Sequence, residues 1–137
     1  PIDFLSVTHN LQDFNKLVHP ENNLKKTLSK IQGRKIIYTN APKTYTYKIL
    51  KISKIFELFD EIFTIEDSNF IPKPDQGMMD TFLKKYNISE GFFIDDVKEN
   101  LFTAKNSGLT TIWITNEENQ PSYIDKKIEK ISDLLSL

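Results

Sequence analysis

The sequence contains no cysteine, and it has only two histidines and four glycines among 137 residues. The absence of cysteine excludes disulfides, thiol catalysis and thiolate metal sites. Because His9 and His19 are the only imidazoles, a structural zinc site has almost no ligands to draw on. The net charge is −1, which argues against binding to nucleic acid or to a membrane surface through bulk charge.

Long apolar stretches are also absent. No run approaches the roughly 20 residues that a membrane span needs. The first residues, Pro1-Ile2-Asp3-Phe4, lack the basic region and the apolar stretch of a signal peptide. We therefore expect a cytoplasmic protein with neither a membrane nor nucleic acid among its partners. The length suits one domain with its own hydrophobic core.

Strand-like and helix-like segments alternate from Arg34 to the end of the chain. Residues 3–17 have a loosely helical spacing of apolar residues. The predicted strands are 35–39, 61–65, 92–94 and 111–115, and the predicted helices are 21–31, 42–52, 76–86, 98–107 and 121–134. This alternation predicts an α/β fold with a Rossmann-like parallel sheet and helices on both faces.

The stretch from Gly91 to Asn100 combines a buried strand with two acids. Its apolar run, residues 92–94, has no polar alternation, which is typical of a strand buried on both faces. Asp95 and Asp96 follow directly, at the edge of the sheet where open α/β folds bind ligands. Adjacent carboxylates repel each other, and Mg²⁺ would relieve that repulsion. The structural alternative is a helix-capping Asp96 beside a solvated Asp95.

Two further polar groups are expected at the same edge, because right-handed crossovers place the carboxyl ends of parallel strands together. Thr39 and Asn40 follow one strand, and Lys73 lies in the loop after the next. For a phosphoryl ligand, Thr39 offers a hydroxyl, the backbone N–H of Asn40 lies at a helix entrance, and Lys73 supplies a positive charge. Alternatively, Thr39 caps the following helix and Lys73 is a surface lysine.

These residues resemble the second, third and fourth motifs of the haloacid dehalogenase-like superfamily of phosphohydrolases. The finer pattern is similar to its pyrimidine 5′-nucleotidase branch. The resemblance depends on Ile37-Tyr38-Thr39-Asn40-Ala41 with Lys43, on Lys73-Pro74, and on Phe92-Phe93-Ile94-Asp95-Asp96 with Asn100 and Gly108-Leu109-Thr110-Thr111.

The resemblance implies roles for the site residues. Thr39, with Asn40 and Lys73, would bind the phosphoryl oxygens, and Lys73 would stabilise charge on a phosphoryl aspartate. Asp96 would ligate Mg²⁺, and Asp95 would act on the metal through water. The substrate would be a small phosphorylated metabolite, with a nucleotide as one candidate.

The family's first motif, a strand ending in Asp-x-Asp, has no counterpart, because the sequence contains no Asp-x-Asp. We therefore expect the nucleophile, the general acid and the central first strand of the sheet to be missing from this chain. The absent strand would lie between the strands at 35–39 and 92–94. Residues 1–20 would be a remnant of the helical cap and its exit, and residues 21–137 a partial core domain of a longer protein.

Several functions remain open. The first is a Mg²⁺-dependent phosphomonoester hydrolase that acts through an aspartyl-phosphate, for which this chain alone would be inactive. The second is a catalytically inactive remnant or partner-binding domain. A phosphoacceptor receiver domain has the same residue types in the reverse order, so the sequence argues against it. Unpaired edges beside a missing strand would favour a homo-oligomer, or association with the chain's own N-terminal fragment.

Overall fold

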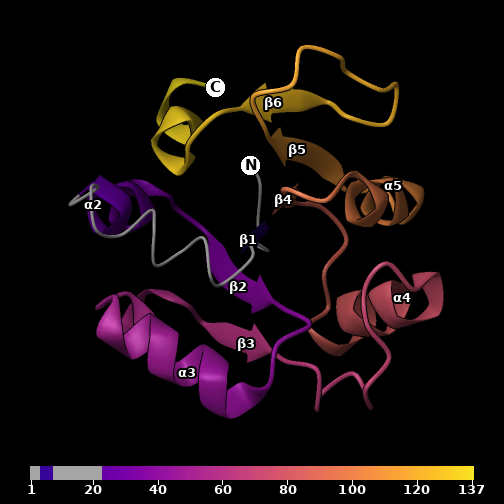
Figure 1. Cartoon of the computed structure of the whole chain (residues 1–137). Helices are drawn as coiled ribbons and strands as arrows, with labels where there is room; N and C mark the ends of the chain where they lie inside the picture. The colour runs from indigo at the N-terminus through magenta and orange to yellow at the C-terminus, as the bar shows by residue number, and fades with distance from the viewer. Residues whose placement is uncertain (1–3, 8–22) are drawn as a thin grey trace.

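The computed structural model describes residues 4–7 and 23–137. These residues form a sheet of six parallel strands in the order β3-β2-β1-β4-β5-β6 (Figure 1). The strands are β1 (Phe4–Val7), β2 (Arg34–Tyr38), β3 (Glu61–Phe63), β4 (Phe92–Asp95), β5 (Thr110–Ile114) and β6 (Lys126–Ile128). The parallel sheet that the alternating pattern predicts is thus confirmed.

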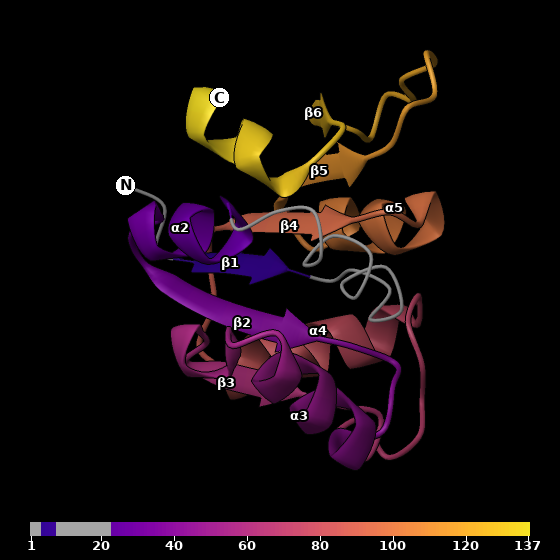
Figure 2. The same cartoon turned by 60° about the vertical axis from the view of Figure 1, so that its left-hand side comes forward.

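Helices cover both faces of the sheet. They are α2 (Asn23–Lys30), α3 (Lys43–Ile52), α4 (Gln76–Lys85) and α5 (Lys98–Asn106), with the 3-10 helices η1 (Phe56–Leu58) and η2 (Ile131–Ser136). Figure 2 shows α2 and α3 on one side of the sheet and α4 and α5 on the other. In the described part of the chain, no helix is both long enough and apolar enough to cross a membrane.

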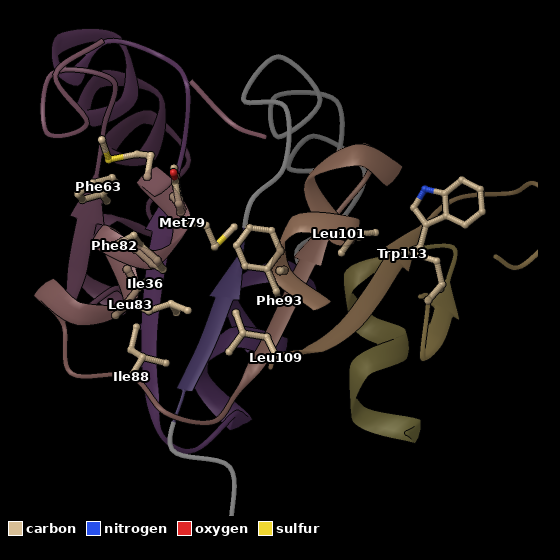
Figure 3. Close-up of a cluster of buried hydrophobic side chains, with 14 residues drawn as sticks. Ile36, Phe63, Met79, Phe82, Leu83, Ile88, Phe93, Leu101, Leu109 and Trp113 are labelled. Carbon is tan, nitrogen blue, oxygen red and sulfur yellow. The ribbon is translucent and has the colours of Figure 1, made fainter. Parts of the chain in front are cut away.

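The core alternates between the two faces along each central strand. In β2, Ile36 and Tyr38 pack in one cluster, and Ile37 packs in the other. In β4, Phe93 packs in the same cluster as Ile36, and Ile94 packs in the same cluster as Ile37. Figure 3 shows the cluster beneath α4 and α5, in which Phe82 and Phe93 are completely buried. Each such side chain contributes roughly 1.5–3 kcal/mol through burial, which explains why these strands read as continuous apolar runs.

Strand β1 occupies the place where a missing strand was expected. Val7 pairs in parallel with Ile37 of β2 on one side and with Ile94 of β4 on the other. The expectation that the central strand is absent, and that its two neighbours have open edges, is therefore wrong. A parallel strand finds its partners far along the chain, so its pairing leaves no local signal, and the spacing over residues 3–17 favoured a helix instead.

The position of β1 also removes the reason for expecting association at those edges. Residues 8–22 lie outside the described part of the chain. The predicted boundary between a cap remnant (1–20) and a core domain (21–137) therefore stays a prediction.

The predicted helix at 121–134 is also wrong. This segment forms β6, which pairs with β5, and then η2. Its isoleucines have helical spacing, but Ile124 packs in the cluster beneath α5, whereas Ile128 and Ile131 pack in the cluster on the opposite face. A single helical stripe could not reach both faces, so tertiary packing overrides the local pattern.

Candidate functional site

Lys73 links three elements at the carboxyl edge of the sheet. Its Nζ donates to the carbonyl of Tyr38, the last residue of β2, at 3.0 Å. The same atom donates to Oδ2 of Asp95, the last residue of β4, at 3.3 Å. It also lies 5.2 Å from the centre of the Tyr38 ring and 6.0 Å from that of Phe93, within the range of cation–π attraction. Lys73 is thus not one more solvated surface lysine.

Asp95 is only 1% exposed. Its Oδ1 accepts a hydrogen bond from the backbone N–H of Val97 at 2.8 Å. Its Oδ2 accepts one from the side-chain amide of Asn100 at 3.0 Å, in addition to the bond from Lys73. A buried carboxylate needs such donors and an opposite charge. The alternative of a solvated Asp95 is therefore wrong.

Thr39 and Asn40 form the turn between β2 and α3. The Thr39 hydroxyl oxygen accepts from the backbone N–H of Ala41 at 3.0 Å, which leaves its O–H as a donor. The side chain of Asn40 accepts from the Lys73 backbone N–H at 2.8 Å and donates to the Lys73 carbonyl at 3.3 Å. Asn40 therefore ties the two loops together. Glu66, not Thr39, caps α3, because its carboxylate accepts from the Lys43 N–H.

Asp96 is half-buried and stands directly before the first turn of α5. Its backbone carbonyl accepts from the indole N–H of Trp113 at 3.0 Å. Trp113 is 1% exposed and lies beside Asp95 in the register of β4 and β5. The indole therefore fixes the peptide that carries the Asp96 side chain. No side-chain capping bond from the N-cap residue of α5, Val97, is found.

The adjacent carboxylates of Asp95 and Asp96 are the candidate metal ligands. Among the described residues, no group of three or more His, Cys, Asp or Glu could hold a metal. Mg²⁺ is commonly bound by only one or two carboxylates, with water and substrate phosphate completing six oxygens. Asp95 already accepts hydrogen bonds at both oxygens, and a pair of adjacent carboxylates is a donor set that fits this mode of Mg²⁺ binding.

All five residues that the sequence pointed to therefore lie at one edge: Thr39, Asn40, Lys73, Asp95 and Asp96. Sequence reasoning assigned no role to three others that hold them in place, Tyr38, Asn100 and Trp113. Asn100 is part of the pattern that carries the family resemblance, but only the fold shows that its side-chain amide reaches Asp95. The carbonyl of Tyr38 and the indole of Trp113 act through the tertiary fold, which no local pattern reveals.

The fold and the site define a class: parallel α/β proteins with a polar site at the carboxyl ends of the central strands. Within this class, the chain belongs to the haloacid dehalogenase-like hydrolase family, which its sequence matches over residues 2–114. No protein with a curated functional description is significantly similar in sequence.

Solved structures share the fold. YfnB from Bacillus subtilis, described as a HAD-hydrolase bound to magnesium, superposes with a TM-score of 0.75 at 24% identity, over 85% of this chain and 54% of that one. A HAD phosphatase from Thermococcus onnurineus superposes with a TM-score of 0.71 at 21% identity, over 92% of this chain and 62% of that one. L-2-haloacid dehalogenase from Xanthobacter autotrophicus superposes with a TM-score of 0.71 at 12% identity, over 82% of this chain and 58% of that one. The chain thus spans little more than half the length of these relatives.

Proposed function

We propose that the carboxyl edge of this sheet binds the phosphoryl group of a small phosphomonoester. The position of Lys73 supports the proposal most strongly, because its ammonium joins the ends of β2 and β4 and lies in the loop after β3. Thr39 contributes a hydroxyl donor, and the backbone N–H of Asn40 stands at the entrance of α3. These are the donors that a phosphoryl group requires.

Magnesium dependence is part of the same proposal. Asp96 would hold Mg²⁺ directly and Asp95 through water. When bound, Mg²⁺ neutralises charge on a phosphoryl oxygen. The protein's own contribution is positional: Asn100 and the Val97 N–H hold Asp95, and Trp113 holds the Asp96 peptide.

Hydrolysis through an aspartyl-phosphate also needs a carboxylate nucleophile. The sequence has no Asp-x-Asp, so in this proposal the nucleophile belongs to residues outside this chain, and the 137 residues alone are inactive. The nucleotide-like substrate of the pyrimidine 5′-nucleotidase branch is a further proposal. It depends on the resemblance of the residues that flank Thr39, Lys73 and Asp95 in the sequence to those of that branch.

A second candidate is a non-catalytic domain that binds a phosphorylated ligand or a partner. The specific observation in its favour is that β1 already fills the place between β2 and β4. In the sequence, β1 is followed by Thr8, His9 and Asn10 instead of an acid. An upstream coding sequence that ends a strand in Asp-x-Asp would favour the hydrolase, and a start codon directly before Pro1 would favour the second candidate.

The test compares the chain with a Thr39→Ala, Lys73→Ala double variant. Phosphate binding is measured by calorimetry, and hydrolysis with p-nitrophenyl phosphate and pyrimidine nucleoside monophosphates in millimolar Mg²⁺. We expect binding in the parent chain only, and equal background hydrolysis in both. Equal phosphate binding would overturn the proposed site. A Mg²⁺-dependent turnover that Asp96→Asn abolishes would show that the chain holds its own nucleophile.

Cytoplasmic location and self-association stay predictions. Light scattering coupled to gel filtration tests the second: a single 16.0 kDa species would contradict an oligomer, and denaturing mass spectrometry of the peak would reveal an associated N-terminal fragment.

A further inference from the structure

A second candidate site lies away from the residues described so far. It is an open hollow of about 500 Å³ lined by Lys25, Lys51, Lys54, Phe56 and Glu57, which we call the lysine hollow. The segment that carries four of these residues leads from the C-terminal end of α3 to the start of β3. Since α3 begins at the carboxyl end of β2, this segment lies at the opposite edge of the sheet from Lys73 (Figure 1).

The hollow collects positive charge that the described residues do not neutralise. Three ammonium groups face one carboxylate, that of Glu57. Within residues 4–7 and 23–137, the ammonium groups of Lys25, Lys51 and Lys54 make no ion pair and no hydrogen bond; Lys25 accepts a bond from the Ser29 hydroxyl only at its backbone carbonyl. Like charges that share a hollow repel one another, and a bound anion would relieve that repulsion.

Aromatic rings hold one of the three lysines in place. The ammonium of Lys51 lies 5.0 Å from the centre of the Phe56 ring and 6.0 Å from that of Tyr47. The two rings pack edge to face at 5.1 Å. The rings therefore restrain the Lys51 ammonium beside Phe56, which also lines the hollow, so less rotamer freedom is lost when it meets a ligand.

Lys54 stands at a strained backbone position at the end of α3. Its N–H donates to the Lys51 carbonyl and the Ile55 N–H donates to the Leu50 carbonyl, which together form a Schellman motif at the end of α3. Lys54 occupies the left-handed position of that motif, with φ 59°. Glycine is favoured there because a Cβ is strained. A lysine at this position makes the helix end less stable and adds a third ammonium to the hollow.

We propose that the lysine hollow binds a compact polyanion, a small ligand with at least two adjacent phosphate or carboxylate groups. The three lysine ammonium groups outnumber the one carboxylate, that of Glu57, and a ligand with two adjacent anionic groups would neutralise the excess positive charge. The volume lies in the range of small-molecule sites, about 300–1,000 Å³. This proposal does not depend on the proposed function, because none of its residues belongs to the carboxyl edge.

The experiment keeps the two sites apart by using the Thr39→Ala chain, in which the buried pair of Lys73 and Asp95 is kept. Pyrophosphate and citrate are titrated separately at 0.15 M salt, and backbone amide shifts in ¹H–¹⁵N spectra locate binding. We expect shifts concentrated between Lys51 and Glu57. Tighter binding of one probe identifies phosphate or carboxylate as the group recognised.

Two variants test the lysines. Lys51→Ala should weaken binding about 3- to 10-fold, as for the loss of one ordinary hydrogen bond, because the exposed ammonium is well solvated in the free chain. Lys85→Ala is the matched control, because its ammonium also lies over two rings, those of Phe63 at 5.5 Å and Tyr86 at 5.6 Å, but lines no part of the hollow. Equal losses in both variants would mean diffuse attraction and overturn the proposal.

Lys54→Gly separates binding from stability. It removes a charge from the hollow but relieves the strained φ, so we expect weaker binding, again about 3- to 10-fold, together with an unchanged or higher Tm. Unchanged affinity in Lys54→Gly would overturn the proposal. So would binding of a single-stranded oligonucleotide with no response to pyrophosphate or citrate, because the ligand would then be a nucleic acid.

Discussion

The ammonium of Lys73 lies 3.3 Å from Oδ2 of Asp95, and the two side chains are only 7% and 2% exposed. A buried ion pair of this kind connects the loop after β3 to the end of β4. Removing one member leaves the other charged group buried without its partner, which is more costly than the pair's own contribution.

We therefore predict that Lys73→Met lowers the free energy of unfolding by about 3–5 kcal/mol, measured by urea denaturation at pH 7. Lys105→Met is the matched control, since Lys105 pairs with Asp125 at 2.8 Å but with side chains 40% and 30% exposed. An exposed pair contributes about 0–1 kcal/mol. Adding Asp95→Asn to Lys73→Met should recover part of the loss. Equal effects of the two lysine substitutions would contradict the buried pair.

Magnesium should bind weakly to the isolated chain, in the millimolar range as an order of magnitude, because water must supply most of the six ligands. The chain has one tryptophan, and its indole donates to the Asp96 carbonyl. Trp113 fluorescence should therefore follow a Mg²⁺ titration. Asp96→Asn should abolish the Mg²⁺ response, and Asp133→Asn, at η2, should leave it intact. A response of equal affinity in Asp96→Asn would remove Asp96 from the metal site.

The central position of β1 can be tested through its backbone. Ser6→Pro removes an N–H from a strand that has neighbours on both sides, so we predict a loss of about 3 kcal/mol or more in unfolding free energy. Ser6→Ala keeps the N–H and is the control. If Ser6→Pro unfolds at the same denaturant concentration as Ser6→Ala, the Phe4–Val7 strand does not stabilise the sheet in solution.

The pair between Asp125 and Lys105 should make stability depend on pH. Burial raises the pKa of Asp125, but hydrogen bonds from Lys105 and Thr111, with the Lys105 charge, lower it overall below its ordinary 3.8. A carboxylate whose pKa falls on folding stabilises the fold above its unfolded pKa, and this is lost as the pH drops through the folded pKa.

Asp125→Asn should therefore be less stable than the parent at pH 7, by up to about 1 kcal/mol for an exposed pair. The difference should shrink as the pH falls below 3.8. Thermal unfolding from pH 7 to pH 2 measures it, and a difference that is constant over this range would contradict the lowered pKa.

Apolar runs and strand-end polar residues were enough to predict β2 to β5, α2 to α5 and the positions of Thr39, Lys73 and Asp95. These features depend on local order along the chain. Gly108 follows the C-cap residue of α5, Ser107, with φ 90°, as expected at a helix C-terminus. Gly33, with φ 94°, lies beyond the end of α2 at Lys30 and directly before β2. Asp75 caps α4, with its carboxylate accepting from the Met78 N–H.

The two failures concern short strands at the ends of the sequence. Strand β1 has four residues and β6 has three, and both lie in segments whose apolar spacing is helical, so only pairing with strands elsewhere in the chain specifies them. The contacts that orient the site were hidden for the same reason. The aromatic rings near the Lys73 ammonium, and the indole that donates to the Asp96 carbonyl, make these contacts only once the sheet is assembled.

The place of β1 has a consequence for synthesis. Val7 pairs with Ile37 and also with Ile94, so this strand is translated long before its second neighbour exists. Until β4 leaves the ribosome, the middle of the sheet presents an open row of N–H and C=O groups, which can recruit strands from other chains. We expect nascent chains arrested between β3 and β4 to be cleaved readily by added protease, and those arrested well beyond β5 to resist it.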